Sequence, residues 1–283
     1  MTIQVKGLRK KYFNKEAVKG VDFTIEPESI IGLLGRNGAG KSTVLNMIAR
    51  RIEKTSGDIT LDGVDLHKTP RIMHQVYLSN TENWFPKEYK FKDLLSIYKK
   101  TYPEFDSEFA EELIKVFGVN VKERFSKAST GYQSIMKIIL ALCNPSEYIF
   151  MDEPVLGLDA NHRHIFNKKL LEAYARNPRT FVIATHLIEE VASILEKVIV
   201  IKDGVVTEEV MVEEVLGKGY VVSGATNLVQ EFVADKNVQE TEQIGNITRA
   251  VVIGKKGETP QGLDFLPLTL QDYFISITRK ENE

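Results

Sequence analysis

The segment Gly35–Thr43 reads Gly-Arg-Asn-Gly-Ala-Gly-Lys-Ser-Thr, which fits the pattern G-x-x-x-x-G-K-[ST]. A short and wholly apolar run, Ile30–Leu34, comes immediately before it, and apolar residues with helical spacing follow over Lys41–Arg51. A wholly apolar run is typical of a central strand that is buried on both faces. Strand, glycine-rich loop and helix in this order are the context that a phosphate-binding loop requires. Together with later strands that alternate with helices, they favour an α/β core.

The glycine-rich loop is expected to bind phosphate groups. Its glycines let backbone N–H groups surround phosphate oxygens, and the start of the following helix adds the positive end of its dipole. We expect the Lys41 ammonium to neutralise charge on the β- and γ-phosphates and the Ser42 hydroxyl to bind Mg²⁺. The predicted nucleotide contacts are Gly35, Arg36, Asn37, Gly38, Ala39, Gly40, Lys41, Ser42 and Thr43. The alternative is a plain glycine turn before a helix.

A second apolar run, Tyr148–Met151, ends in the paired carboxylates of Asp152 and Glu153. We expect Asp152 to hold Mg²⁺ through water and Glu153 to face an attacking water as general base. An acidic pair after a strand is usually structural when it occurs alone. Combined with the phosphate-binding loop, it indicates a site that hydrolyses a nucleoside triphosphate.

Length and composition restrict the function classes. At ~150 residues per domain, 283 residues predict about two domains. The 37 Lys and Arg against 39 Asp and Glu leave a net charge of −2, which disfavours a dedicated nucleic-acid-binding protein. The single cysteine, Cys143, excludes an intrachain disulfide framework and fits a reducing cytosol. Apolar runs such as Val198–Ile201 are far shorter than the ~20 residues of a membrane-spanning helix, so we expect a chain that is soluble by itself.

The chain is expected to divide after residue 213. Alternating apolar and polar residues predict strands near the N-terminus, and helical spacing over about 84–145 indicates an all-helical insertion within 1–213. Helical spacing also predicts a helix at Leu187–Leu195. In 214–283, short β-rich pieces separated by glycine indicate a small α+β appendage.

In their order along the chain, these motifs are similar to those of the ATP-binding subunits of ATP-binding-cassette (ABC) transporters, over about residues 2–210. Tyr12 stands where the family stacks an aromatic ring on adenine, although Phe13 could substitute and Tyr12 could be an ordinary loop aromatic. The remaining matches are Ala128–Gln133 at the family signature, Asp152-Glu153 at the second Walker motif, Gly157–Asp159 in the loop after it and Thr185-His186 at the switch histidine. The resemblance implies a P-loop ATPase core with an N-terminal antiparallel β subdomain and a helical insertion.

The resemblance further implies ATP and Mg²⁺ as cofactors and hydrolysis between two paired subunits. ATP would lie between the phosphate loop of one subunit and the signature of the other, where Ser129 and Gly131 would contact the γ-phosphate. Asp159 would join the ATP site, and His186 would orient the attacking water with Glu153. Plainer alternatives are a helix N-cap for Ser129 and a structural histidine for His186.

The implied partners are separate membrane-spanning subunits and a second ATPase subunit in a homodimer or heterodimer, on the cytoplasmic face of the cell membrane. The run Thr101–Asp106 before an atypical signature is similar to bacterial exporter ATPases for antibiotics and amphipathic peptides. Trp84, Phe85 and Tyr89 are candidates for a groove that receives a membrane subunit, or for packing under the helical block. Two other classes stay open: a soluble ABC ATPase that acts on DNA or ribosomes, and a weakly hydrolysing nucleotide-sensing module.

The sequence departs from the family pattern at two places. The signature usually begins with Leu and continues Ser-Gly-Gly-Gln, and this chain keeps only Ser129 and Gly131. The family usually has glutamine at the end of the strand before the helical block, in contact with Mg²⁺ and the membrane partner. Asn80, one methylene shorter, stands there and remains a candidate ATP and Mg²⁺ ligand. Either the direct metal contact is lost or a water fills the gap, and we expect looser coupling and slow basal hydrolysis.

Overall fold

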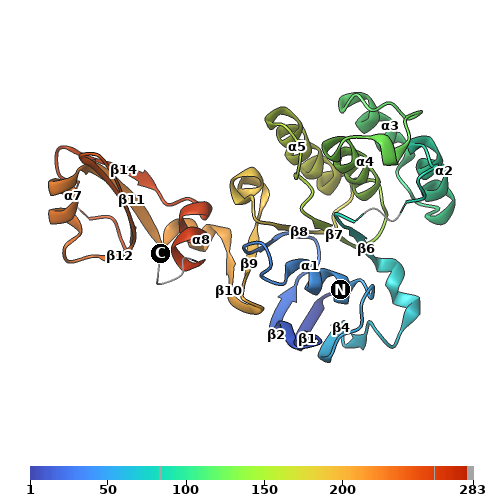
Figure 1. Ribbon diagram of the computed structural model, residues 1–283, viewed down its shortest axis with the longest axis horizontal. Coiled ribbons are helices and arrows are strands. Elements are labelled where there is room, and N and C mark those ends of the chain that lie inside the picture. Colours follow the sequence, from blue (N-terminus) through green and yellow to red (C-terminus); the bar gives the residue numbers. More distant parts are fainter. Residues whose placement is uncertain (83–84, 258, 279–283) are drawn as a thin grey trace. The chain divides into compact units, whose positions relative to one another are not determined.

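The computed structural model describes residues 1–82, 85–257 and 259–278 (Figure 1). It forms two compact units, Met1–Glu209 and Val210–Glu283. The first unit contains a parallel and an antiparallel sheet, and the second contains an antiparallel sheet of its own. Among the described residues, no helix is long and apolar enough to cross a membrane.

A six-stranded sheet forms the centre of the first unit. Across the sheet the strands are β10 (Val205–Met211), β9 (Lys197–Lys202), β3 (Ile30–Leu34), β8 (Thr180–Thr185), β7 (Tyr148–Asp152) and β6 (Val76–Ser79). The pairs β9–β3, β3–β8, β8–β7 and β7–β6 are parallel, and β3, β7 and β8 are buried throughout. Because the carboxyl ends of parallel strands meet at one edge, the residues that follow β3, β6, β7 and β8 are brought together there.

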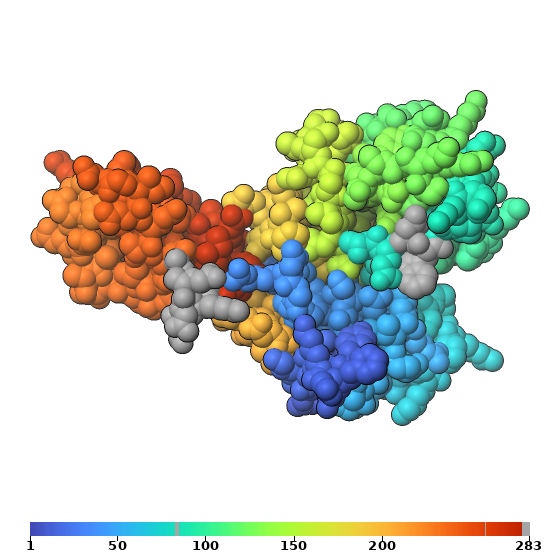
Figure 2. All heavy atoms as spheres, viewed as in Figure 1, coloured from blue at the N-terminus to red at the C-terminus, as the bar shows by residue number. Residues whose placement is uncertain are grey.

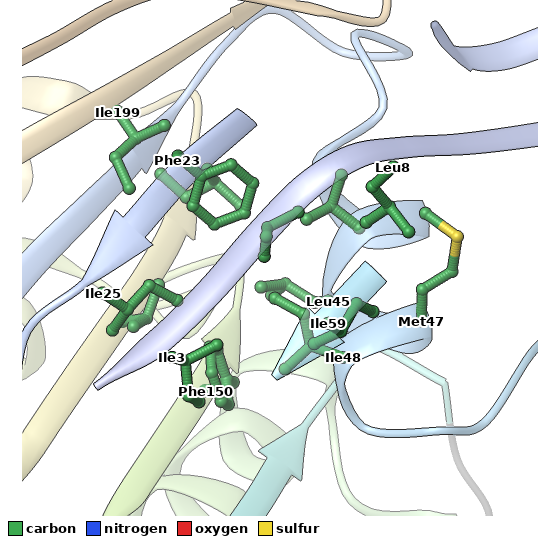
Figure 3. Close-up of a cluster of buried hydrophobic side chains, with 14 of the residues drawn as sticks. Ile3, Leu8, Phe23, Ile25, Leu45, Met47, Ile48, Ile59, Phe150 and Ile199 are labelled. Atoms are coloured by element: carbon green, nitrogen blue, oxygen red, sulfur yellow. The ribbon is translucent and has the colours of Figure 1, made fainter. Parts of the chain in front are cut away.

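A second, antiparallel sheet covers one face of this centre. Its order is β2 (Lys15–Ile25), β1 (Ile3–Tyr12), β4 (Ser56–Leu61) and β5 (Val64–Asp65). Helix α1 (Lys41–Ile48) contacts both β2 and β7. Figure 3 shows the resulting core, in which Ile3, Leu8, Phe23, Ile25 and Ile59 of the antiparallel sheet meet Leu45, Met47 and Ile48 of α1 and Phe150 and Ile199 of the parallel sheet. This arrangement confirms the predicted α/β core with an N-terminal antiparallel subdomain.

The helical segment lies on the opposite face of the parallel sheet. Its helices are α2 (Phe91–Thr101), α3 (Ser107–Val116) and α4 (Thr130–Leu142), followed after β7 by α5 (Ala160–Arg176). Helix α4 contacts β6, β7 and the other three helices. Figures 1 and 2 show α2, α3 and α4, in teal to green, on the far side of the parallel sheet from the blue strands β1 and β2.

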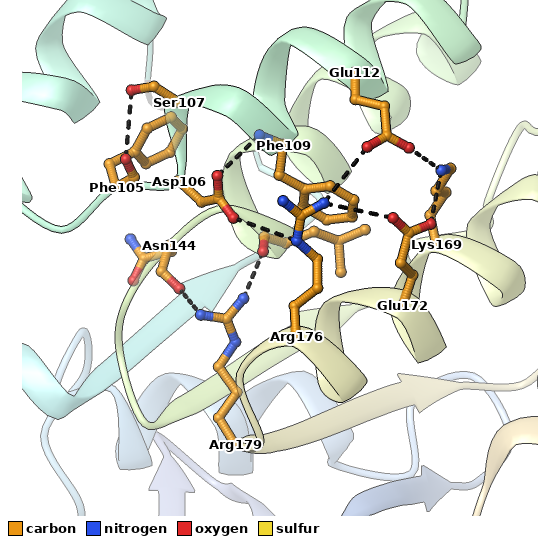
Figure 4. Close-up of polar contacts among 11 residues, drawn as sticks. Phe105, Asp106, Ser107, Phe109, Glu112, Asn144, Lys169, Glu172, Arg176 and Arg179 are labelled. Atoms are coloured by element: carbon orange, nitrogen blue, oxygen red, sulfur yellow. Dashed lines mark hydrogen bonds and ion pairs between the residues drawn. The ribbon is translucent and has the colours of Figure 1, made fainter.

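Polar contacts hold α3 against α5 and the end of α4 against the segment that follows α5 (Figure 4). The Arg176 guanidinium of α5 lies 3.5 Å from Glu112 and 3.9 Å from Asp106, which caps the start of α3. Arg179 donates to the Leu142 carbonyl at 2.6 Å, at the last turn of α4. Because the carboxylates and Arg176 are about one third exposed or more, each such pair contributes only ~0–1 kcal/mol, and the network mainly sets position.

The predicted helix at Leu187–Leu195 is wrong. The chain forms two 3₁₀ turns there, Ile188–Glu190 and Ala192–Ile194. The buried Ile188, Val191 and Ile194 recur every three residues, which is the period of a 3₁₀ helix and not of an α-helix. Over so short a segment the two periods look alike in a sequence.

The second unit is an α+β appendage, as the sequence predicts. Its sheet order is β12 (Asn237–Ile244), β13 (Ile247–Ile253), β11 (Gly219–Ala225) and β14 (Leu263–Pro267), and its helices are α6 (Val212–Gly217), α7 (Thr226–Val233) and α8 (Leu270–Thr278). Tyr220, Val222 and Val252 pack with Val229 of α7. The compact unit that the structure forms starts at Val210, and its first helix, α6, buries Val212 and Val215 and contacts α8.

Candidate functional site

The loop between β3 and α1 has the backbone that the sequence predicts for phosphate binding. Gly38 and Gly40 have φ values of 81° and 112°, a region that favours glycine. A Cβ on Gly35 would stand 2.4 Å from the Ile201 carbonyl oxygen, so a side chain cannot fit there. These three glycines are therefore required by the local conformation and by the close approach of β9.

Lys41, the first residue of α1, turns its side chain back into this loop. Its Nζ donates to the Gly35 carbonyl at 2.7 Å and the Arg36 carbonyl at 3.3 Å, and lies 3.6 Å from Oε1 of Glu153. The side chain is buried, which lowers the pKa of Lys41, while the carboxylates of Glu153 and Asp152 oppose that shift. A positive charge is thereby held at the point where the phosphates of a nucleotide are expected.

Asp152, the last residue of β7, is buried beside α1. Burial raises the pKa of Asp152, and a side-chain hydrogen bond with Ser42 opposes the shift. Its Oδ1 has no hydrogen-bond partner among the described residues. Carboxylate and hydroxyl oxygens suit Mg²⁺, which usually keeps several waters and binds one or two carboxylates together with phosphates. Ser42 and Asp152 therefore fit a Mg²⁺ ion that a bound nucleotide would help to hold.

Glu153 is the best-connected carboxylate of the site. Its Oε2 accepts from the Thr185 hydroxyl at 2.8 Å, and its Oε1 lies 2.8 Å from Nδ1 of His186. The backbone of Glu153 has φ 49°, a strained value for a residue with a side chain, and its N–H donates to Ala184 at 2.8 Å. The end of β7 and the end of β8 thus aim this carboxylate at Lys41.

A groove of about 370 Å³ runs beside these groups. It is lined by Tyr12, Lys15, Ala17, Asn37, Gly38, Ala39, Gly40, Lys41, Ser42, Thr43, Thr81, Asp152 and Glu153. Tyr12 lies near the tip of the β1–β2 hairpin, is 42% exposed, and has Nζ of Lys10 at 4.9 Å from its ring centre. The neighbouring Phe13 is 98% exposed and does not line the groove, which favours Tyr12 over Phe13 as the aromatic that meets a base.

The signature residues lie apart from this groove, at the start of α4. Ser129 is the N-cap of α4, and its hydroxyl accepts from the Tyr132 N–H at 3.3 Å. A Cβ on Gly131 would come within 2.2 Å of the Gly157 carbonyl oxygen. Gly131 is therefore needed for packing against the loop after β7, a role that the motif alone did not reveal. Neither residue is among the described residues that line the groove.

Asp159 also caps a helix in this chain. Its carboxylate accepts from the N–H of His162 at 2.8 Å and lies 2.9 Å from Nδ1 of the same residue, at the start of α5. These hydrogen bonds hold the pKa of Asp159 below its usual value. Asp159 is exposed and does not line the groove of its own chain. A nucleotide could contact it only at the exposed start of α5.

Asn80 follows β6 and is buried, and its Nδ2 has no hydrogen-bond partner among the described residues. It lines a small cleft of about 60 Å³ that also reaches Asp152 and Glu153. Lys137 of α4 lines the same cleft and was missed by sequence reasoning. The available signal was a lysine within the otherwise apolar stretch Ile135–Leu142. Thr185, whose hydroxyl donates to Glu153, enters the sequence motif only as the residue before His186.

The structure gives different answers for the three aromatic residues that could form a groove for a membrane subunit. Trp84 lies outside the described residues. The ring of Phe85 packs edge-to-face on Phe125, with centroids 4.9 Å apart. Phe125 is fully buried in the helical segment, so packing is the better interpretation for Phe85. Tyr89 is half-buried and stays a candidate.

Comparisons with known proteins point to one family. The family model described as "ABC transporter" matches residues 18–156. The ABC transporter ATP-binding protein NatA of Bacillus subtilis (strain 168) is 33% identical over 67% of this chain and 79% of its own length. The ABC transporter ATP-binding protein YtrB of the same organism is 28% identical over 97% of each chain.

Solved structures support the same fold. A dimeric bacterial ABC transporter cassette matches with a TM-score of 0.64, at 24% identity, over 74% of this chain and 98% of its own. Since the glycine-rich loop, the acidic pair and His186 converge at one sheet edge, and a relative that is 33% identical matches over 79% of its own length, the chain belongs to the ATP-binding subunits of ABC transporters.

Proposed function

We propose that this chain hydrolyses Mg²⁺-bound ATP in the groove beside α1. The observation that carries the proposal is the position of Glu153, whose carboxylate lies 3.6 Å from the phosphate-loop Lys41 and is held by Thr185 and His186. A carboxylate at this position suits a general base that accepts a proton from the attacking water. Backbone N–H groups of the loop and Lys41 would stabilise the charge on the phosphates.

Mg²⁺ would be held by Ser42 and Asp152, with Asn80 beside them. The ion would neutralise charge on the β- and γ-phosphate oxygens. His186 would then have a double role, since it fixes the Glu153 carboxylate through Nδ1 and leaves its other ring nitrogen for the γ-phosphate. Tyr12 would stack on the adenine ring.

We further propose that ATP is bound between two such subunits. Ser129, Gly131 and Asp159 do not line the groove of their own chain and lie at the starts of α4 and α5. Helix N-termini are suited to phosphate groups because their N–H groups and dipoles favour negative charge. A second subunit would present these residues to the γ-phosphate, which agrees with a dimeric cassette among the structural neighbours.

ATP hydrolysis by the dimer would power separate membrane-spanning subunits, and the dimer would lie at the inner face of the cell membrane. We propose export of peptides, antibiotics or other amphipathic compounds, because the run Thr101–Asp106 and the atypical signature are similar to such ATPases. The names of relatives include both Nod factor export and ribose import, so those names favour neither direction.

The proposal is tested by replacing the base. Glu153→Gln should retain ATP without hydrolysing it, so the subunits stay paired and the variant elutes as a dimer with ATP and Mg²⁺ in size-exclusion chromatography with light scattering. The control is Glu189→Gln, the same change at an exposed residue, which should behave as the wild type. A Glu153→Gln variant that binds ATP but remains monomeric would contradict the paired site.

A further inference from the structure

Lys137 makes an unusual set of contacts from the middle of α4. Its Nζ donates to three consecutive backbone carbonyls, those of Asn80 at 2.8 Å, Thr81 at 2.9 Å and Glu82 at 3.1 Å. An ammonium group has three N–H donors, and here all three are directed at the segment that follows β6. The side chain thus connects one turn of α4 to a short piece of backbone that begins with Asn80.

If residue 137 served only to fill space, a lysine would be unfavourable, because burying its charge costs desolvation free energy. Its neighbours Ile135, Met136 and Ile138 are buried, and burial together with the charge of Arg51 lowers the pKa of Lys137. Among the described residues, no carboxylate forms an ion pair with its Nζ; the three backbone carbonyls accept from it directly, and the more distant Glu82 carboxylate opposes the lowering of the pKa of Lys137. A methionine would fill the same space without desolvating a charge. The position is therefore better explained by the three hydrogen bonds than by packing.

The segment that Lys137 holds leads to the expected metal site. One cleft of about 60 Å³ is lined by Asn80 and Lys137 and also by Asp152 and Glu153. That volume is enough for a few water molecules. Because Asn80 has a short side chain, a small displacement of its backbone changes whether its amide reaches a metal ion or a metal-bound water beside Asp152.

The N-terminal half of α4 is held against the loop that follows β7. Ser134 donates to the Leu156 carbonyl at 3.0 Å, and Gly131 lies against Gly157. The same rigid helix therefore contacts both the loop behind the acidic pair and, through Lys137, the segment that carries Asn80.

We propose that Lys137 is a positioning residue that holds the segment Asn80–Glu82 on α4, so that the short Asn80 side chain stands at the Mg²⁺ site of Ser42 and Asp152. This proposal rests on the proposed function, since it concerns the metal that accompanies ATP. Its consequence is that metal affinity depends on where α4 lies, and hence on the signature residues at the start of the same helix.

The test measures metal binding without turnover. Mn²⁺ is titrated against the full chain with saturating AMP-PNP and followed by electron paramagnetic resonance. Lys137→Met should weaken Mn²⁺ binding by about tenfold, the lower end of the effect of losing an outer-shell partner. AMP-PNP binding measured in EDTA should stay within about twofold, because Lys137 does not line the nucleotide groove. The matched control is Tyr77→Phe, which removes a 2.9 Å hydrogen bond to Tyr98 from the same strand β6 but leaves the segment 80–82 untouched.

A double substitution separates positioning from general damage. If Lys137 acts through Asn80, Lys137→Met should change Mn²⁺ affinity little in an Asn80→Ala background. The effects of two substitutions do not add when one residue acts through the other. Unchanged Mn²⁺ affinity in Lys137→Met, or an effect that adds fully to that of Asn80→Ala, would overturn the proposal. Should Lys137→Met fail to fold, as judged by thermal unfolding, Lys137→Gln is held to the same criteria. A wild type that binds neither AMP-PNP nor Mn²⁺ would instead refute the proposed function.

Discussion

The two sides of the proposed nucleotide site differ in how completely one chain builds them. On the groove side, the Glu153 carboxylate lies 3.6 Å from Nζ of Lys41 and 2.8 Å from Nδ1 of His186. On the signature side, Ser129 and Asp159 only cap helices of their own chain, and neither reaches the groove. The difference indicates that the groove is preorganised in a single subunit, whereas the signature is a surface that a second subunit must meet.

Lys41→Met should disrupt the groove side most strongly. The change removes a buried cation that would bind phosphate oxygens, and hydrogen bonds to charged groups contribute ~1.5–3 kcal/mol, or roughly 10- to 150-fold in affinity. We expect ATP binding in isothermal titration calorimetry to weaken by this factor. Lys99→Met, at an exposed position of α2, should bind as the wild type does. Equal affinities for the Lys41 variant and the wild type would mean that phosphate is not bound at this loop.

Gly131→Ala should damage the signature side and spare the groove. The added Cβ would meet a backbone oxygen at 2.2 Å, and overpacking of this kind costs ~1–3 kcal/mol. We expect lower stability in urea unfolding and loss of ATPase activity, while the affinity for ATP stays near that of the wild type. The control Gly217→Ala adds a Cβ that meets nothing within 4 Å. A Gly131→Ala variant with full activity would show that the start of α4 does not need this close contact.

Thr185→Val tests whether the hydroxyl that donates to the Glu153 carboxylate contributes to the rate of hydrolysis in the groove. The substitution keeps the shape and removes a 2.8 Å hydrogen bond to the carboxylate, for which about 1.5 kcal/mol, or about tenfold in kcat, is expected. Thr185→Ser retains the hydroxyl and should recover most of the rate. Similar kcat values for the valine and serine variants would argue that His186 alone orients Glu153.

Asp159→Ala should have the smallest effect, and one that depends on pH. Hydrogen bonds from His162 lower the pKa of Asp159, so its stabilising effect is present above the ordinary value of 3.8 and is lost as the pH falls through the lower folded value. The wild type should therefore have a slightly higher urea midpoint than the variant at pH 5. The difference should shrink below pH 3.8. A difference that instead grows as the pH falls from 5 to below 3.8 would mean that the carboxylate is not the stabilising form.

Local motifs made most of the groove predictable. Gly35–Thr43 is contiguous, and its glycine pattern, the preceding apolar strand and the following helix are all visible in the sequence. The acidic pair Asp152-Glu153 likewise directly follows an apolar, strand-like run in the sequence. Their convergence followed from a general property of parallel strands, so the α/β core and the groove could be anticipated.

The parts that could not be predicted depend on contacts between distant segments. Gly131 touches Gly157 and Lys137 reaches Asn80, and nothing in either local sequence specifies the other partner. The helix expected at Leu187–Leu195 failed for a different reason, because three-residue and 3.6-residue periods cannot be separated over two turns. The contact between α6 and α8 in the second unit is also non-local.

The central claim is that one chain supplies a complete groove and needs a second subunit for the signature. It is tested most directly by the steady-state ATPase rate per subunit, measured as the protein concentration is raised, for the wild type beside Glu153→Gln. We expect a rate per subunit that rises with concentration in the wild type and is absent in the variant. A rate per subunit that is independent of concentration, in protein that light scattering shows to be monomeric under the assay conditions, would contradict the claim, because hydrolysis would then be complete within one chain.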